Sequence, residues 1–290
     1  MSNSIEGALT LWYLLTAGAL AFLIWDLFTN TPANRIMKLA WILVVLYTGP
    51  IGLFVYLLSC RQPLPDTHDT FIAPQWKQAT GSLLHCIAGD ATGIIFSAAI
   101  VYHFGLPNGL DFVIEYISAF VVGLLVFQAL FMRAMYGGSY WLAVRKTFFA
   151  ETVSMNMVMV GMFPTMAILM HALPGADDPT RALFWGVMSA ATMAGMITAY
   201  PINSWMVSRE LKHGMMTAIP GHKGKEGGDM STSMDMETMP QDMDHSMKND
   251  HRAKTLPKVQ VLAVSLGTFA GLALALWITA RFVPIVFTLK

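Results

Sequence analysis

Seven stretches of about 20 apolar residues, each with few charges, are separated by polar segments along the chain. A helix rising about 1.5 Å per residue crosses the roughly 30 Å hydrocarbon core of a bilayer with a stretch of this length. Backbone groups in lipid must be paired within the segment, which favours helices, and the alternating ten-residue pattern of barrel strands is absent from the sequence. We therefore predict an all-α, polytopic integral membrane helix bundle of about seven transmembrane helices. The predicted spans are Ala8–Phe28, Met37–Leu58, Ser82–His103, Phe112–Met132, Thr152–His171, Leu183–Val207 and Val259–Ala280.

Composition supports a protein whose main partner is the lipid bilayer. Apolar residues make up 55% of the chain and charged residues only 12%, about half the charged fraction of a soluble domain. The formal net charge is zero, which argues against nucleic acid as a partner. Two cysteines exclude a disulfide scaffold.

Lysine and arginine are unevenly shared between the two predicted sides of the membrane. With seven crossings, 13 of the 18 basic residues fall on the side of the N-terminus and five on the other. Cytoplasmic loops carry the excess of basic residues. The pattern predicts a multi-pass protein of a bacterial inner (plasma) membrane, with a cytoplasmic N-terminus and a periplasmic C-terminus. The segment before the first span has no basic residue, so we expect that span to be retained rather than cleaved as a signal peptide.

The spacing of the spans divides the chain into four parts. We predict an N-terminal transmembrane hairpin over 1–60, a four-helix membrane core over 80–210, a Met/His-rich disordered loop over 211–257 and a C-terminal transmembrane helix over 258–290. The loop is expected to be disordered because it is polar and rich in glycine near its start.

Ionisable and soft side chains within the third and fifth spans are candidates for an ion path. Charged groups in a membrane are costly and are usually functional. Cys86 and Asp90 are four residues apart and share a helix face, and a methionine series continues from Glu151 at helical spacing. The alternatives are polar contacts that hold helices together, and methionines that simply fill the core. The candidate path residues are His85, Cys86, Asp90, Glu151, Met155, Asn156 and Met159.

A methionine-rich tract in the long loop is the most specific chemical signal. Six of the 18 residues from Met230 to Met247 are methionine, in a polar segment that has no core to fill. Thioethers are soft ligands that favour Cu(I) and similar ions, and exposed methionines without a role would be sites of oxidation. We predict metal capture by Met230, Met234, Met236, Met239, Met243, His245 and Met247.

Two resemblances extend these predictions. The segment 243–247, Met-Asp-His-Ser-Met, resembles the Met/His repeats of bacterial copper-resistance proteins, which implies a copper ligand set. A broader resemblance covers about residues 80–212 and rests on segments 85–90, 151–159, 200–203 and 211–215. It is to a bacterial multi-pass membrane family catalogued only as a domain of unknown function, so it implies architecture and candidate residues but no activity.

The sequence favours a membrane protein that handles a soft metal ion. It contains no Gly-x-Ser-x-Gly elbow, Walker loop, dinucleotide-binding fingerprint or His-Glu-x-x-His motif, so we do not expect an enzyme. The leading hypothesis is transport of, or tolerance to, Cu(I), with copper as the bound ion. One alternative is a non-transporting scaffold, metallochaperone or assembly factor. The candidate protein partners are a second copy of the chain, in a homo-oligomer, or a respiratory or copper protein. The other is a core of unrelated function with an accessory metal-buffering loop.

Overall fold

The computed structural model describes residues 3–215 and 256–287 as a bundle of long helices. It is 81% helical, with no strand among the described residues. Within these described residues, seven helices are long and apolar enough to cross a membrane, which confirms the predicted all-α membrane bundle. The helices are α1 (Asn3–Thr29), α2 (Arg35–Ser59), α3 (His68–Ile72), α4 (Gln75–Val101), α5 (Asn108–Val121), α6 (Ala129–Met132), α7 (Tyr140–Ala172), α8 (Ala182–Ser208) and α10 (Lys258–Thr279).

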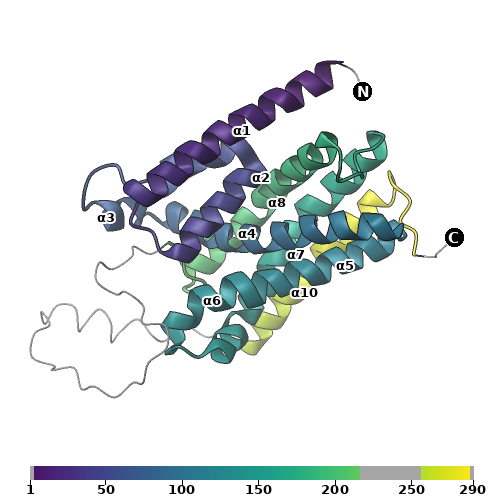
Figure 1. The fold of residues 1–290 in the computed structure, drawn as a ribbon. Coiled ribbons are helices and arrows are strands. Elements are labelled where there is room, and N and C mark those ends of the chain that lie inside the picture. Colours follow the sequence, from purple (N-terminus) through teal and green to yellow (C-terminus); the bar gives the residue numbers. More distant parts are fainter. Residues whose placement is uncertain (1–2, 216–255, 288–290) are drawn as a thin grey trace, which may run out of the picture.

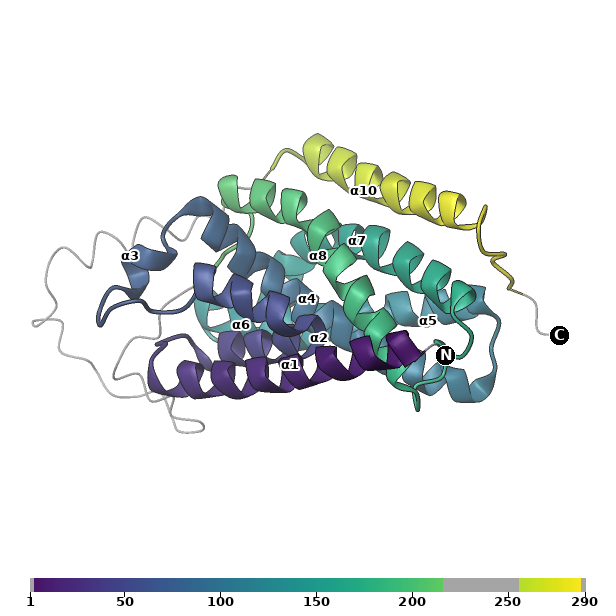
Figure 2. The ribbon, with the colours of Figure 1, turned by 90° about the horizontal axis from the view of Figure 1, so that it is seen from above.

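Helix α4 lies at the centre of the bundle, between α2, α5, α7 and α8 (Figure 1). Nearly every residue from Ala79 to Ile95 is buried. Helices α1 and α10 lie on opposite outer sides (Figure 2) and leave most of their surface uncovered. Glycines and other small residues are frequent along α4, and they permit close approach between membrane helices.

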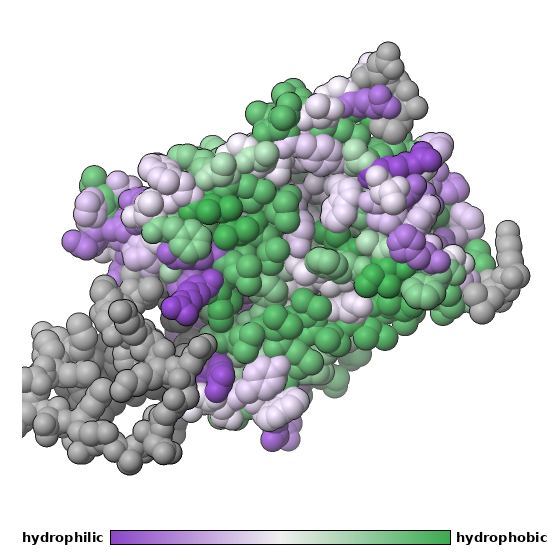
Figure 3. All heavy atoms as spheres, in the orientation of Figure 1, coloured by the Kyte–Doolittle hydropathy of each residue, from purple (hydrophilic) through white to green (hydrophobic). Residues whose placement is uncertain are grey.

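On the face drawn in Figure 3, apolar residues prevail along the middle of the bundle and hydrophilic residues gather at both ends. Large apolar side chains such as Leu14, Phe54, Phe96 and Ile197 are exposed. An exposed apolar surface of this extent marks contact with lipid or with another protein. The distribution fits a multi-pass membrane protein.

Helix α2 is folded back on itself rather than straight. Trp41 and Tyr56 are 15 residues apart and would be separated by about 22 Å along a straight helix, yet their ring centroids lie 5.1 Å apart. The reversal occurs at Gly49, whose φ of 58° and ψ of −138° are not helical. Pro50 follows and lacks the amide hydrogen that would continue the helix.

The two ends of α2 are tied to the same end of α1. Tyr56 and Arg61 both donate hydrogen bonds to the buried carboxylate of Asp26, at 2.6 and 3.0 Å. The Thr31 hydroxyl lies 2.7 Å from the Tyr56 hydroxyl. The turn of α2 at Gly49 packs against α1 about ten residues before Asp26. A Cβ added at Gly49 would lie 2.6 Å from the Thr16 hydroxyl. Helix α2 therefore enters the bundle and returns to the end where it began.

This reversal bears on the predicted membrane topology. The run Met37–Leu58 is long enough to span, as predicted, but its two arms begin and end together near α3. We call this the α3 end; it also holds the starts of α4, α7 and α10 and the end of α8 (Figure 1). The start of α1 and the end of α10 lie at the opposite end of the bundle (Figure 1). The prediction that the two termini lie on opposite sides counts α2 as a crossing, and a folded-back α2 does not support that count.

Two further elements differ from the predicted spans. Helix α7 begins at Tyr140, 12 residues before the predicted start at Thr152, because no glycine or proline interrupts that stretch. A π-helix, Val122–Gln128, joins α5 to α6 within one predicted span. π-helical turns are rare in proteins overall, but those that do occur are often found at functional sites.

Candidate functional site

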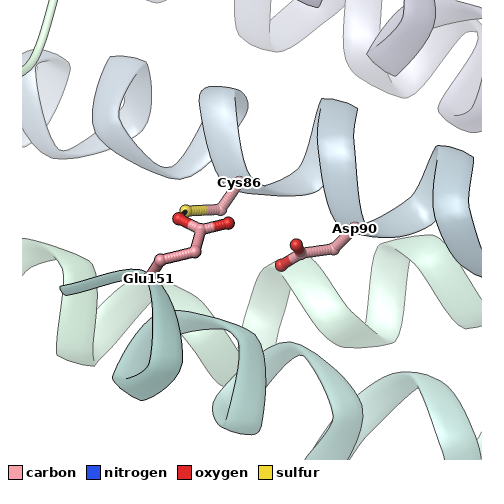
Figure 4. Close-up of side chains that lie close together, drawn as sticks. All are labelled: Cys86, Asp90 and Glu151. Carbon is pink, nitrogen blue, oxygen red and sulfur yellow. Dashed lines mark hydrogen bonds between the residues drawn. The ribbon is translucent and has the colours of Figure 1, made fainter. Parts of the chain in front are cut away.

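A group of polar side chains from four segments meets in the buried centre of the bundle. We call Cys86 and Asp90 of α4, Glu151 of α7, Asn203 of α8 and Lys212 the core cluster. Each is at most 4% exposed. Cys86 and Asp90 lie one helical turn apart, on the same face of α4, and both point toward Glu151 (Figure 4).

Three metal-ligating side chains converge in this cluster. One ligand atom from each of Cys86, Asp90 and Glu151 can be chosen so that all three lie within 4.8 Å of one another. The Cys86 thiol donates a hydrogen bond to Glu151 Oε2 at 3.1 Å. These groups come from two helices, so their meeting depends on how α4 packs against α7.

A lysine occupies the side of the cluster nearest the α3 end. Lys212 follows α8, and its Nζ donates to Cys86 Sγ at 2.6 Å and to Asn203 Oδ1 at 2.9 Å. Lys212 is the basic group of the cluster, and its amine lies inside the bundle. One ammonium faces two carboxyl groups, those of Asp90 and Glu151.

Asn203 fixes the position of this lysine. Its amide nitrogen donates to Ser154 Oγ at 2.8 Å and to the Ala199 carbonyl at 2.9 Å. The amide oxygen is thereby turned toward Lys212. Three helices and the segment after α8 are thus joined through hydrogen bonds around one cation.

Several carboxyl oxygens of the cluster have no partner. Both oxygens of Asp90 and Oε1 of Glu151 are buried without a hydrogen bond among the described residues. A buried polar group without a partner is costly, and a buried unpaired charge more so. These oxygens are therefore positions at which a proton or a metal cation would be strongly stabilised.

Two glycines make room for the carboxyl groups. A Cβ at Gly123, in the π-helix, would lie 2.3 Å from Asp90 Oδ1 and 2.4 Å from Glu151 Oε1. A Cβ at Gly89 would lie 2.6 Å from the Cα of Gly123. Backbone approach this close requires glycine on both elements. The π-helix thus presents bare backbone to Asp90 and Glu151.

The other predicted path residues have different surroundings. The His85 ring lies against Phe131, tilted by 37° at a centroid distance of 3.8 Å, and neither ring nitrogen has a hydrogen bond among the described residues. Asn156 accepts from the Tyr116 hydroxyl at 2.8 Å and donates to Thr268 at 3.2 Å. Its amide therefore links α5, α7 and α10. Met155 and Met159 are buried in the apolar core.

The structure thus brings Cys86, Asp90 and Glu151 together and adds three residues that were not predicted. Asn203, Lys212 and Gly123 carry no metal-ligating signal in the sequence. Asn203 and Lys212 did fall within the segments that carry the family resemblance. The seven predicted ligands of the loop, Met230, Met234, Met236, Met239, Met243, His245 and Met247, lie outside the described residues.

Comparison with known proteins identifies the part of the chain that carries this cluster. No curated protein and no solved structure matches the chain. The predicted resemblance over about residues 80–212 is confirmed, with a slightly earlier start. Residues 75–212, which include the whole core cluster, match the family model described as a domain of unknown function (DUF4396).

Proposed function

We propose that this protein carries a soft metal cation across a membrane, with Cu(I) as the first candidate and the core cluster as its intramembrane site. The observation that carries the proposal is the convergence of Cys86, Asp90 and Glu151 within 4.8 Å in the buried centre of the bundle. The unpaired oxygens of the two carboxyl groups add to it. The proposed role is transport of the ion, not catalysis.

The donor set fits a soft or borderline cation. A thiolate is a soft ligand, whereas carboxylates are hard ligands that many cations accept. The cluster alone therefore favours a metal ion that binds sulfur. It discriminates among such ions less sharply than a set of thioethers would. Selection of Cu(I) is assigned to the methionine-rich sequence from Met230 to Met247, which offers six thioethers.

Lys212 supplies a counter-charge that the cargo can replace. Its ammonium is held by Cys86 and Asn203 beside the carboxyl groups. A monovalent cation can bind the Cys86 sulfur as the thiol proton passes to the neighbouring Glu151 carboxylate, which already accepts its hydrogen bond. If that cation also moves the ammonium aside, the net charge of the cluster is unchanged. Exchange of one cation for the other avoids leaving an uncompensated charge in the bundle, which would be costly.

We infer that the α3 end faces the cytoplasm. Of the described basic residues, ten lie at or near this end and two, Arg181 and Arg281, at the other. Basic residues concentrate on the cytoplasmic side of membrane proteins. The ten are Arg35, Lys38, Arg61, Lys77, Arg133, Arg145, Lys146, Arg209, Lys212 and Lys258.

This orientation predicts that both termini lie outside the cytoplasm. Single cysteines introduced at Ser4 and Phe287 in a Cys60→Ser, Cys86→Ser background should react with an impermeant maleimide added to intact cells. Cysteines at Thr67 and Ser139, at the α3 end, should react only after the cells are opened. A Ser4 cysteine and a Phe287 cysteine labelled from opposite sides would contradict the folded-back form of α2.

Silver flux into proteoliposomes tests the proposed function. Ag⁺ is a soft monovalent ion that needs no reductant, and its uptake by the wild-type protein should exceed that by empty vesicles. Glu151→Gln removes one carboxylate of the cluster and should lower the uptake rate by tenfold or more, equivalent to at least about 1.4 kcal/mol. Glu6→Gln, at an exposed position, is the matched control and should transport normally.

Flux that is unchanged in Glu151→Gln would rule out the core cluster as the transport site. Silver binding by the wild-type protein without any flux would instead support a scaffold or metallochaperone.

A further inference from the structure

A second group of ligand-type side chains surrounds a cavity at the end of the bundle opposite α3. The cavity has a volume of about 450 Å³ and lies between the start of α5, the end of α7 and the segment after α10. Most of its wall is apolar. Its ligand-type lining residues are Asp111, Glu115, Met166, Met170, His171 and Asp177.

Glu115 is the buried polar group of this cavity. Its side chain is 4% exposed, and Oε2 has no hydrogen-bond partner among the described residues. Asp111, one turn earlier on α5, also has one buried carboxyl oxygen without a partner. A buried carboxyl oxygen without a hydrogen-bond partner, such as Oε2 of Glu115, is stabilised by a proton or a bound cation.

Two thioethers and an imidazole complete the lining. Met166 and Met170 are four residues apart on α7 and share a face. His171 is exposed at the mouth of the cavity. Thioethers do not coordinate hard cations such as Mg²⁺ well, whereas thioether, imidazole and carboxylate together suit a soft or borderline metal ion. The chemistry of the lining is therefore that of the proposed cargo.

The cavity lies in line with the core cluster. Glu115 precedes Gly123 by eight residues, about 12 Å along the helix axis, and Gly123 contacts the carboxyl groups of the cluster. On α7, Met166 follows Glu151 by about 22 Å. The residues between them on the same face, Met155, Met159 and Met162, are buried, at 0%, 1% and 1% exposed. A series of thioethers therefore runs inside the bundle from the cluster to the cavity.

We infer that this cavity is a second binding site for a soft metal cation, through which the ion enters or leaves the core cluster at the end opposite α3. The inference rests on the proposed function. It assigns ligand roles to Glu115, Met166 and Met170, with Asp111 and His171 nearer the mouth.

Silver binding to the full-length protein in nanodiscs tests this site directly. Equilibrium dialysis against Ag⁺ should show about one silver ion fewer per chain for Glu115→Gln, or an affinity for that ion weakened about tenfold. Met170→Leu should act in the same direction, and it preserves the apolar volume of a half-buried position. Met157→Leu is the matched control, since Met157 lies on α7 but outside the cavity lining.

Unchanged silver binding in both Glu115→Gln and Met170→Leu would overturn the inference, as would an equal loss in Met157→Leu. Flux separates this result from failure of the proposed function. Cavity variants should raise the silver concentration for half-maximal uptake from the cavity end about tenfold while the maximal rate is kept. Core variants should instead lower the maximal rate. Normal flux in Glu151→Gln together with lost binding in Glu115→Gln would contradict the core site but support the cavity site.

Discussion

Replacing Lys212 with methionine is expected to lower the free energy of unfolding by about 3–5 kcal/mol, the usual effect of leaving a buried charge without its partner. Lys212 is 4% exposed and donates to Cys86 and Asn203 beside two carboxyl groups. Methionine fills a similar volume but carries no charge and no donor. The loss should appear as a lower unfolding midpoint of the purified protein in detergent, followed by circular dichroism.

A second substitution separates loss of charge balance from loss of packing. In the double variant Lys212→Met, Glu151→Gln, one negative group is removed together with the positive one, so much of the lost stability should return. The coupling energy from the double-mutant cycle should be about 1–3 kcal/mol. Lys146→Met, at an exposed position, should change stability by less than about 0.5 kcal/mol. Strictly additive effects of the two core substitutions would show that Lys212 does not balance Glu151.

The Gly123→Ala variant should disrupt the core cluster through a single added methyl group. The new Cβ would lie 2.3 Å from Asp90 Oδ1 and 2.4 Å from Glu151 Oε1, so at least one carboxyl group must move. Overpacking in a well-packed interior typically costs about 1–3 kcal/mol. Displacing a ligand should also weaken silver binding at the cluster, with the flux rate reduced at least about tenfold.

The matched control for this methyl group is Gly18→Ala in α1, where an added Cβ meets nothing within 4 Å. Alanine there should leave flux unchanged and raise helix stability slightly, since glycine is the weaker helix former by about 1 kcal/mol. If Gly123→Ala transports silver as well as Gly18→Ala does, the carboxyl groups are not held where the structure places them.

The helices could be predicted from the sequence because length and apolarity decide whether a segment is stable in lipid. Those quantities do not reveal whether a segment crosses. The two arms of α2 are both apolar, and their total length equals that of a span, so hydropathy alone reads them as one helix. The local signal was Gly49 followed by Pro50, a pair that favours a turn. Deciding between a kink and a full reversal required the contacts of Trp41, Tyr56 and Asp26.

About half of the core cluster could be predicted. Cys86 and Asp90 share a face through the i, i+4 geometry of one helix, which sequence spacing gives directly. Their meeting with Glu151 depends on the rotation and axial position of α7, which spacing within a helix does not determine. Lys212 lies outside every apolar run, so apart from the family resemblance it was counted as a basic residue of a loop. Asn156 was predicted as a path residue but does not join the cluster, because its amide forms hydrogen bonds with Tyr116 and Thr268 instead.

The most direct measurement of the central claim is whether the metal ion binds the thiol of Cys86. A metal–thiolate bond gives an ultraviolet charge-transfer band, and the methionine-rich loop contains no cysteine. Titrating Ag⁺ into the full-length protein should produce this band in the wild type and in Cys60→Ser, a control at the only other cysteine. The band should be absent from Cys86→Ser. A wild-type protein that binds silver without the band, or a Cys86→Ser variant that keeps it, would contradict an intramembrane metal site at the core cluster.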